Sequence, residues 1–136
     1  MSKVPLSHGA VWLVLTMVVS LAALVSTTEL RHHRLKVNTA ETLSGGDPSR
    51  APEIFRRYGC AGCHAIPGVP GADGQVGPPL SELSQRLYIA GVLENSSDNL
   101  TAWVVSPQRF SPNSAMPPTG VSEKEARDLA AYLYAR

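Results

Sequence analysis

The amino-acid sequence predicts an all-α fold in which a single N-terminal transmembrane helix precedes one small helical domain. Three observations predict it: an uncharged apolar run near the N-terminus, helix-capping signals in the C-terminal half, and the lack of a strand pattern of comparable strength. A length of 136 residues suits one modest domain with an appendage. We divide the chain into an N-terminal cap at residues 1–9, a transmembrane anchor at 10–30, a flexible tether at 31–51 and a domain at 52–136.

The anchor is predicted from residues 10–25, which read AVWLVLTMVVSLAALV and carry no charge. Apart from His8, the uncharged run extends from Leu6 to Thr28, close to the ~20 residues that a helix needs to cross a bilayer core of ~30 Å. A cleaved signal peptide is the alternative. Its apolar core usually has about 7–15 residues and ends at a small-residue cleavage site, for which residues 26–28 are a weak candidate. We expect an uncleaved anchor.

The tether is predicted from a polar segment. Residues 31–51 contain Gly-Gly-Asp-Pro and show no sustained apolar period, which is typical of a flexible connection. The basic residues of this segment also bear on orientation, because Lys and Arg gather on the cytoplasmic side of membrane spans. Arg31, Arg34 and Lys36 outnumber Lys3, so charge alone favours a cytoplasmic domain.

Three helices are predicted before the C-terminal segment. A short helix covers PEIFRRYGC, with Pro52 in its first turn. A second begins at Ser81 and has Gly91 near its end, and a third lies between Ser97 and Pro107. Together with the helix that follows, they predict an all-α domain.

The last helix has the clearest signal. Ser122 and Glu125 form an S-x-x-E capping box. Apolar residues follow at helical spacing, namely Ala126, Leu129, Ala130 and Leu133. The sequence therefore predicts a capped amphipathic helix at the C-terminus.

Both cysteines lie in the segment YGCAGCHAI, with His64 directly after Cys63. Cys60 and Cys63 could form a redox dithiol, half of a zinc site or, with the histidine, the attachment site of a c-type haem. Structural zinc usually takes ligands from two clusters, but the other histidines all lie upstream, in or beside the apolar segment. A redox dithiol is followed by a helix, whereas a segment rich in Gly and Pro follows here. The pattern favours one haem c, covalently held through Cys60 and Cys63 with His64 on the iron.

A haem iron bound by His64 has a second axial position. Met17 lies in the anchor and another methionine starts the chain, which leaves Met116 in the Pro-flanked segment RFSPNSAMPPTG. The alternatives are a methionine that fills a gap in the core and ligation by His32 or His33, for which the tether would have to fold back. We expect His64 and Met116 to bind the iron. This pair leaves no open position for a substrate and favours one-electron transfer at high potential.

The segments FRRYGCAGCHAI, GPPL, NLTAWV and AMPPTG, in this order, resemble class I c-type cytochromes over residues 52–136. The segment RLYIAGVLENSSDNLTAWVVSPQRFSPNSAMP is similar to the cytochrome c domain of cytochrome c oxidase subunit II and to small membrane-anchored cytochrome c subunits. The C-x-x-C-H motif is specific, and the methionine loop is moderately so. The resemblance implies a cytochrome c-like helical domain wrapped around one covalent haem.

The resemblance also implies roles for further cofactor-binding residues. The backbone carbonyl of Pro78 would accept the Nδ1 proton of the axial histidine, and Leu80 would pack on a haem face. The indole of Trp103 would reach a haem propionate, with plain core packing as the alternative. Arg86 and Tyr88 would also contact a propionate, with a solvated side chain as the alternative for Arg86.

Together these expectations describe a membrane-anchored monohaem cytochrome c, not an enzyme. It would carry single electrons in a respiratory chain, from a quinol-oxidising complex of the cytochrome bc kind to a terminal oxidase. We expect a single-pass protein of the bacterial inner membrane with the haem domain on the periplasmic or outer face, because haem c is attached there. For the orientation in the membrane, we give the haem-attachment motif more weight than the distribution of Lys and Arg around the span.

The expected partners are respiratory membrane complexes, with no nucleic acid and no small-molecule substrate. Residues 51–136 hold seven basic and eight acidic side chains, so docking through an apolar haem-edge patch is expected rather than strong charge steering. One alternative function is the electron-accepting cytochrome subunit of a periplasmic dehydrogenase. An alternative of a different class is a haem peroxidase with a displaceable methionine ligand.

Overall fold

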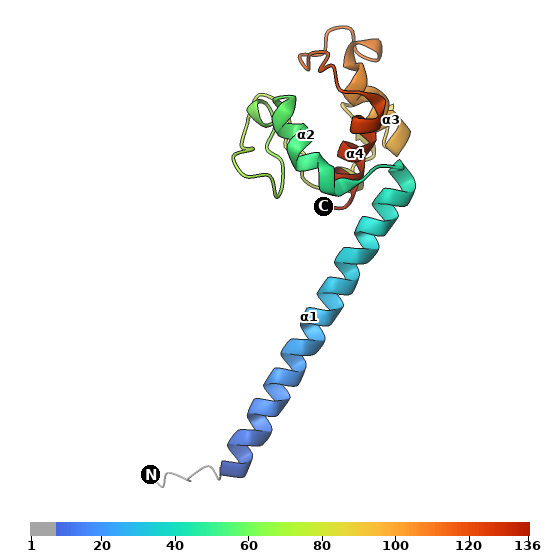
Figure 1. Cartoon of the computed structure of the whole chain (residues 1–136). Helices are drawn as coiled ribbons and strands as arrows, with labels where there is room; N and C mark the ends of the chain where they lie inside the picture. The colour runs from blue at the N-terminus through green and yellow to red at the C-terminus, as the bar shows by residue number, and fades with distance from the viewer. Residues whose placement is uncertain (1–7) are drawn as a thin grey trace. The chain divides into compact units, whose positions relative to one another are not determined.

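The structure, a computed structural model, describes residues 8–136, so most of the expected N-terminal cap at 1–9 lies outside the described residues. The chain divides into two compact units, and the boundary lies between Arg34 and Leu35. The described residues are mostly helical with a small two-stranded sheet, which confirms the predicted all-α class. Figure 1 shows these elements along the chain.

Helix α1 runs from His8 to Ser44 as one continuous helix (Figure 1). Its large apolar side chains, among them Trp12 and Met17, are exposed. The helix is long and apolar enough to cross a membrane. Such a surface is stable in a lipid environment and unfavourable in water.

Helix α1 continues beyond the predicted anchor, and the expectation of an irregular tether is wrong for residues 31–44. Extending an existing helix costs much less free energy than nucleating a new one, so a polar segment without an apolar period stays helical when a long helix precedes it. Neither Gly nor Pro interrupts residues 31–44. The helix ends where Gly45 adopts a φ of +67°, a left-handed conformation that glycine tolerates best.

The second unit contains three further α-helices, several 3-10 turns and a short hairpin (Figure 1). In chain order these elements are η1 (Pro48–Arg50), α2 (Ala51–Arg57), η2 (Cys60–Gly62), η3 (Leu83–Gln85), β1 (Tyr88–Ile89), β2 (Leu93–Glu94), α3 (Ser97–Val105), η4 (Pro107–Arg109) and α4 (Glu123–Tyr134). Strands β1 and β2 pair antiparallel, and Ile89 lies opposite Leu93. Helix α4 packs against both α2 and α3.

The core of the second unit forms around α4. The ring edge of Phe55 in α2 meets the ring of Tyr132 in α4, with centroids 5.5 Å apart and planes at 73°. This edge-to-face geometry is the favourable one for aromatic pairs. The hydroxyl of Tyr132 donates to the backbone carbonyl of Pro67 at 2.7 Å, so α4 also fixes the loop after the two cysteines.

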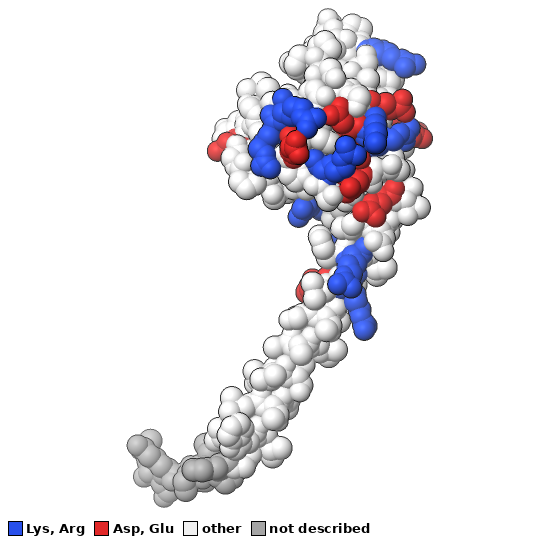
Figure 2. Space-filling view, viewed as in Figure 1, with Lys and Arg blue, Asp and Glu red and all other residues white. Residues whose placement is uncertain are grey.

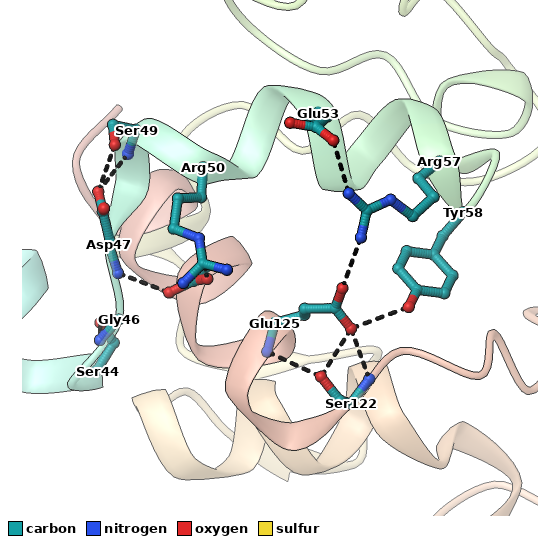
Figure 3. A network of polar contacts seen from close by, with 11 residues as sticks. Ser44, Gly46, Asp47, Ser49, Arg50, Glu53, Arg57, Tyr58, Ser122 and Glu125 are labelled. Carbon is teal, nitrogen blue, oxygen red and sulfur yellow. Dashed lines mark hydrogen bonds and ion pairs between the residues drawn. The ribbon is translucent and has the colours of Figure 1, made fainter.

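The end of the expected tether also differs from the prediction, because it packs against α4. A Cβ on Gly46 would lie 2.2 Å from the carbonyl carbon of Arg127, so only glycine fits there. The N–H of Asp47 donates to Oδ1 of Asp128 at 2.8 Å, and Nε of Arg50 lies 3.5 Å from its Oδ2 (Figure 3). The side chain of Asp128 is only 4% exposed. This segment is therefore bound to the domain.

Three of the predicted helices are confirmed as α2, α3 and α4. Pro52 lies in the first turn of α2, and both halves of the Ser122–Glu125 capping box are formed. The predicted helix from Ser81 is wrong, because this region contains the turn η3 and the hairpin β1–β2.

Contacts distant in sequence explain the missing helix. The side-chain amide of Asn95 donates to the carbonyls of Leu83 and Arg86, both at 2.7 Å. Because these two carbonyls already accept hydrogen bonds from Asn95, they do not need the N–H partners that a helix would provide. Glu82 and Ala90 adopt positive φ values of 53° and 50°, which no continuous right-handed helix allows.

We expect Asp128→Ala to destabilise the domain by about 1–3 kcal/mol, because the N–H of Asp47 loses its acceptor and Arg50 loses its ionic partner. Urea unfolding of the full chain in detergent measures this change. Hydrogen exchange should accelerate at Asp47 in particular. Lys124→Ala, on the exposed side of the same helix, is the control and should unfold like the parent. Equal midpoints for the two variants would contradict this account of the segment.

Candidate functional site

The C-x-x-C-H segment lies in a tight turn directly after α2. Gly59 has a φ of +70°, which turns the chain out of the helix and suits glycine. In η2 the N–H groups of Cys63 and His64 donate to the carbonyl of Cys60, at 3.2 and 3.0 Å. One turn of backbone thus carries both cysteines and the histidine.

The ring of His64 is oriented by a backbone carbonyl. Nδ1–H of His64 donates to the carbonyl oxygen of Pro78 at 2.8 Å, the contact that the resemblance implied. A carbonyl only accepts, so this bond fixes the proton on Nδ1 and leaves the lone pair on Nε2. A metal ligand histidine is commonly held in this way.

The sequence did not indicate that two glycines, Gly74 and Gly77, lie against the cysteine turn and the His64 ring. A Cβ on Gly77 would lie 2.3 Å from Cε1 of His64, and a Cβ on Gly74 would lie 2.6 Å from the carbonyl carbon of Cys63. Both positions therefore require glycine so that the loop can lie against the cysteine turn. The N–H of Gly77 also donates to the carbonyl of Cys63 at 2.7 Å. For Gly77, its place directly before Pro78 and Pro79 is the feature of the sequence that could have indicated this close approach.

The environment of the cysteines does not suit the two competing chemistries. Both thiols are free and half-buried, and burial raises the pKa of the Cys60 thiol above its ordinary value of 9.0. A redox dithiol needs the opposite shift, because the thiolate is the nucleophile. Within residues 8–136 no group of three or more His, Cys, Asp or Glu side chains could hold a metal ion, so a zinc site finds no further ligands there.

Met116 lies in a loop that α3 and η4 hold in place. Its side chain is half-buried and packs against the hydrophobic core. Its carbonyl accepts from Nε2 of Gln108 at 2.5 Å, and its N–H donates to Oγ of Ser114 at 3.2 Å. Further along the loop, the hydroxyl of Thr119 donates to the carbonyl of Val104 at 3.2 Å. The backbone around the thioether is therefore fixed.

The remaining predicted residues have contacts within the protein. Leu80 is half-buried against the core, and Trp103 is buried in α3 with 8% exposure. The guanidinium of Arg86 donates to the carbonyls of Pro79 and Ser81, so it braces the loop that follows Pro78. Tyr88 is exposed. Contacts of these side chains with a haem stay predictions.

The residues present fit a covalently bound haem. They offer two thiols, an imidazole with a free Nε2 and a thioether, which is the donor set of haem c with His and Met axial ligands. Large apolar side chains of the domain are also uncovered, with exposed fractions of 81% for both Val76 and Leu87. A flat apolar cofactor would bury such surface favourably.

The comparisons with known proteins agree with this fit. The sequence model of the family described as cytochrome c matches residues 48–135. The chain is 38% identical over 82 residues to cytochrome c oxidase subunit 2 of Alkalihalophilus pseudofirmus. This match covers 60% of this chain and 23% of the relative. The protein of the same name in Bacillus subtilis is 29% identical, and the match covers 71% of this chain and 28% of that relative. The one in Bacillus sp. strain PS3 is 32% identical, and the match covers 64% of this chain and 26% of that relative.

The chain thus spans about a quarter of the length of the curated relatives that it matches. No solved structure matches with significance. The family match covers the cysteine turn, the His64–Pro78 bond and the methionine loop together. On this ground the chain belongs to the cytochrome c family.

Proposed function

We propose that this chain is a membrane-anchored monohaem cytochrome c that carries single electrons in a respiratory chain and is not itself an enzyme. Membership of the family implies haem binding and electron transfer, and Cys60 and Cys63 fit the attachment motif. The observation that carries the proposal is the hydrogen bond from Nδ1 of His64 to Pro78, which presents Nε2 as a metal ligand.

Cys60 and Cys63 would hold the cofactor through thioethers, while His64 and Met116 would occupy the two axial positions of the iron. When bound, haem supplies an iron that gains and loses one electron. With Met116 as a ligand, its thioether would favour the ferrous state and so raise the reduction potential. The hydrogen bonds at His64 and Met116 support this role, because they would restrain both ligands when the iron changes its oxidation state. Two protein ligands leave no position for peroxide, which weighs against the peroxidase alternative.

Helix α1 supports the proposed membrane anchor. We propose that the haem domain lies on the periplasmic or outer face of the bacterial inner membrane, since covalent haem attachment takes place there. The basic residues Arg31, Arg34 and Lys36 then follow the span on its outer side, against the usual charge bias. Anchoring keeps the domain near its membrane partners and raises its effective concentration.

The proposed partners are a quinol-oxidising donor complex and a terminal oxidase. The three relatives are oxidase subunits by name, which supports an oxidase as the acceptor. Figure 2 shows acidic and basic side chains mixed on the visible face of the haem domain, without a large area of one sign. Docking would therefore depend on apolar contact rather than on strong electrostatic steering.

Cysteine replacement tests the cofactor. The double variant Cys60→Ser, Cys63→Ser should lose haem staining completely on a denaturing gel, because neither thioether can form. The parent should keep the stain through denaturation. A parent chain without covalent haem would refute the proposal.

Met116→Ala tests the second axial ligand. We expect it to abolish the long-wavelength sulfur-to-iron charge-transfer band of the ferric protein and to lower the reduction potential, because the thioether favours ferrous iron. Met17→Ala, in the exposed surface of α1, is the matched control and should leave both unchanged. A persistent band in Met116→Ala would show that another residue is the ligand.

Reconstitution tests the partners. The full chain, placed in proteoliposomes with a quinol-oxidising complex and a terminal oxidase, should restore quinol-dependent oxygen consumption, and the double cysteine variant should not. A periplasmic dehydrogenase in place of the quinol-oxidising complex tests the runner-up. Restoration by the dehydrogenase alone would overturn the proposed donor.

A further inference from the structure

The carboxylate of Glu125, in the first turn of α4, contacts two segments that lie far apart in the sequence (Figure 3). On one side it closes the capping box, because Oε2 accepts from the N–H and the hydroxyl of Ser122, at 3.2 and 2.7 Å. On the other side Oε2 accepts from the hydroxyl of Tyr58 at 2.9 Å, and Oε1 accepts from Nη1 of Arg57 at 3.1 Å. One side chain thus joins the start of α4 to the end of α2.

The two contacted segments are the ones that carry the axial ligands of the proposed haem. Tyr58 stands at the end of α2, and only Gly59 separates it from Cys60 and the turn that leads to His64. Ser122 ends the loop that follows η4 and contains Met116.

The contact is better protected than an ordinary surface ion pair. The side chain of Glu125 is 16% exposed, whereas that of Glu53, which also pairs with Arg57, is 77% exposed. Charge-assisted hydrogen bonds of this kind are stronger than neutral ones, and exposed pairs contribute little. The hydrogen bonds from Ser122 and Tyr58 also hold the pKa of Glu125 below its ordinary value of 4.5, so the carboxylate is charged at neutral pH.

We propose that Glu125 is a positioning residue that fixes the spacing between the His64 segment and the Met116 segment, and thereby keeps Met116 on the iron. The inference rests on the proposed function. Without the carboxylate, the hydroxyl of Tyr58 loses its acceptor and the first turn of α4 loses its capping box. One of the links between the loop that ends at Ser122 and the cysteine turn is then lost, and the thioether would leave the metal more readily.

The test is the competition between Met116 and added imidazole in the haem-loaded full chain. Imidazole binds ferric iron only where the thioether has left, so its apparent affinity reports how firmly Met116 is held. We expect Glu125→Ala to raise that affinity roughly five- to tenfold, as expected for the loss of one or two net hydrogen bonds. Glu125→Gln keeps a capping-box residue and should fall between Glu125→Ala and the parent.

Two further variants separate positioning from general stability. Tyr58→Phe removes the contact on the cysteine side and leaves the capping box intact, so it should raise the imidazole affinity by a smaller factor even if Glu125→Ala fails to fold. Glu123→Ala is the matched control, because Glu123 lies in the same helical turn and pairs with Arg127 instead. It should bind imidazole like the parent.

The outcomes separate this inference from the proposed function. If the parent protein lacks the sulfur-to-iron band, Met116 is not an iron ligand. Both the proposed ligand set and the positioning role of Glu125 are then refuted. The positioning role alone is overturned if the parent shows that band but the Tyr58→Phe and Glu125→Gln proteins bind imidazole with the same affinity as the parent. An equal rise in Glu123→Ala also overturns it, because the effect would then belong to α4 in general.

Discussion

The contact between α2 and α4 is the constraint on which the cytochrome c domain depends. Phe55 and Tyr132 pack edge to face at its centre, and α2 ends directly before the turn that holds Cys60. The hydroxyl of Tyr132 extends the same contact to the loop after that turn, through Pro67. The position of the proposed iron ligand His64 is therefore set by a helix pair formed from opposite ends of the domain, so the site exists only when the whole domain is folded.

The domain combines a rigid ligand frame with a small core. The imidazole of His64 is held by the backbone carbonyl of Pro78 and lies against Gly77, and the methionine loop is likewise held by bonds to its backbone. A frame of this kind suits electron transfer, because ligands that do not move between oxidation states add little reorganisation. The apolar side chains left uncovered, such as Val76 and Leu87, suit a cofactor that completes the core or a partner that docks on it.

Local signals predicted the parts of the structure that depend on local contacts. The Ser122–Glu125 capping box and the cysteine turn could be read directly, since every residue involved lies within one turn. Contacts distant in sequence explain the misses. Asn95 holds carbonyls that the expected helix from Ser81 would have used, and the buried carboxylate of Asp128 accepts from Asp47, which belongs to the expected tether. Nothing near these residues in the sequence indicates either contact.

The mixture of charges on the haem domain has a consequence for its surroundings. Seven basic and eight acidic side chains nearly cancel over residues 51–136, and Figure 2 shows both signs side by side. Ionic strength changes an encounter rate mainly when one partner carries a strong field of one sign. On the proposed outer side of the cell, where the salt content of the fluid varies, this domain would meet its partners at a nearly constant rate in dilute and in saline media alike.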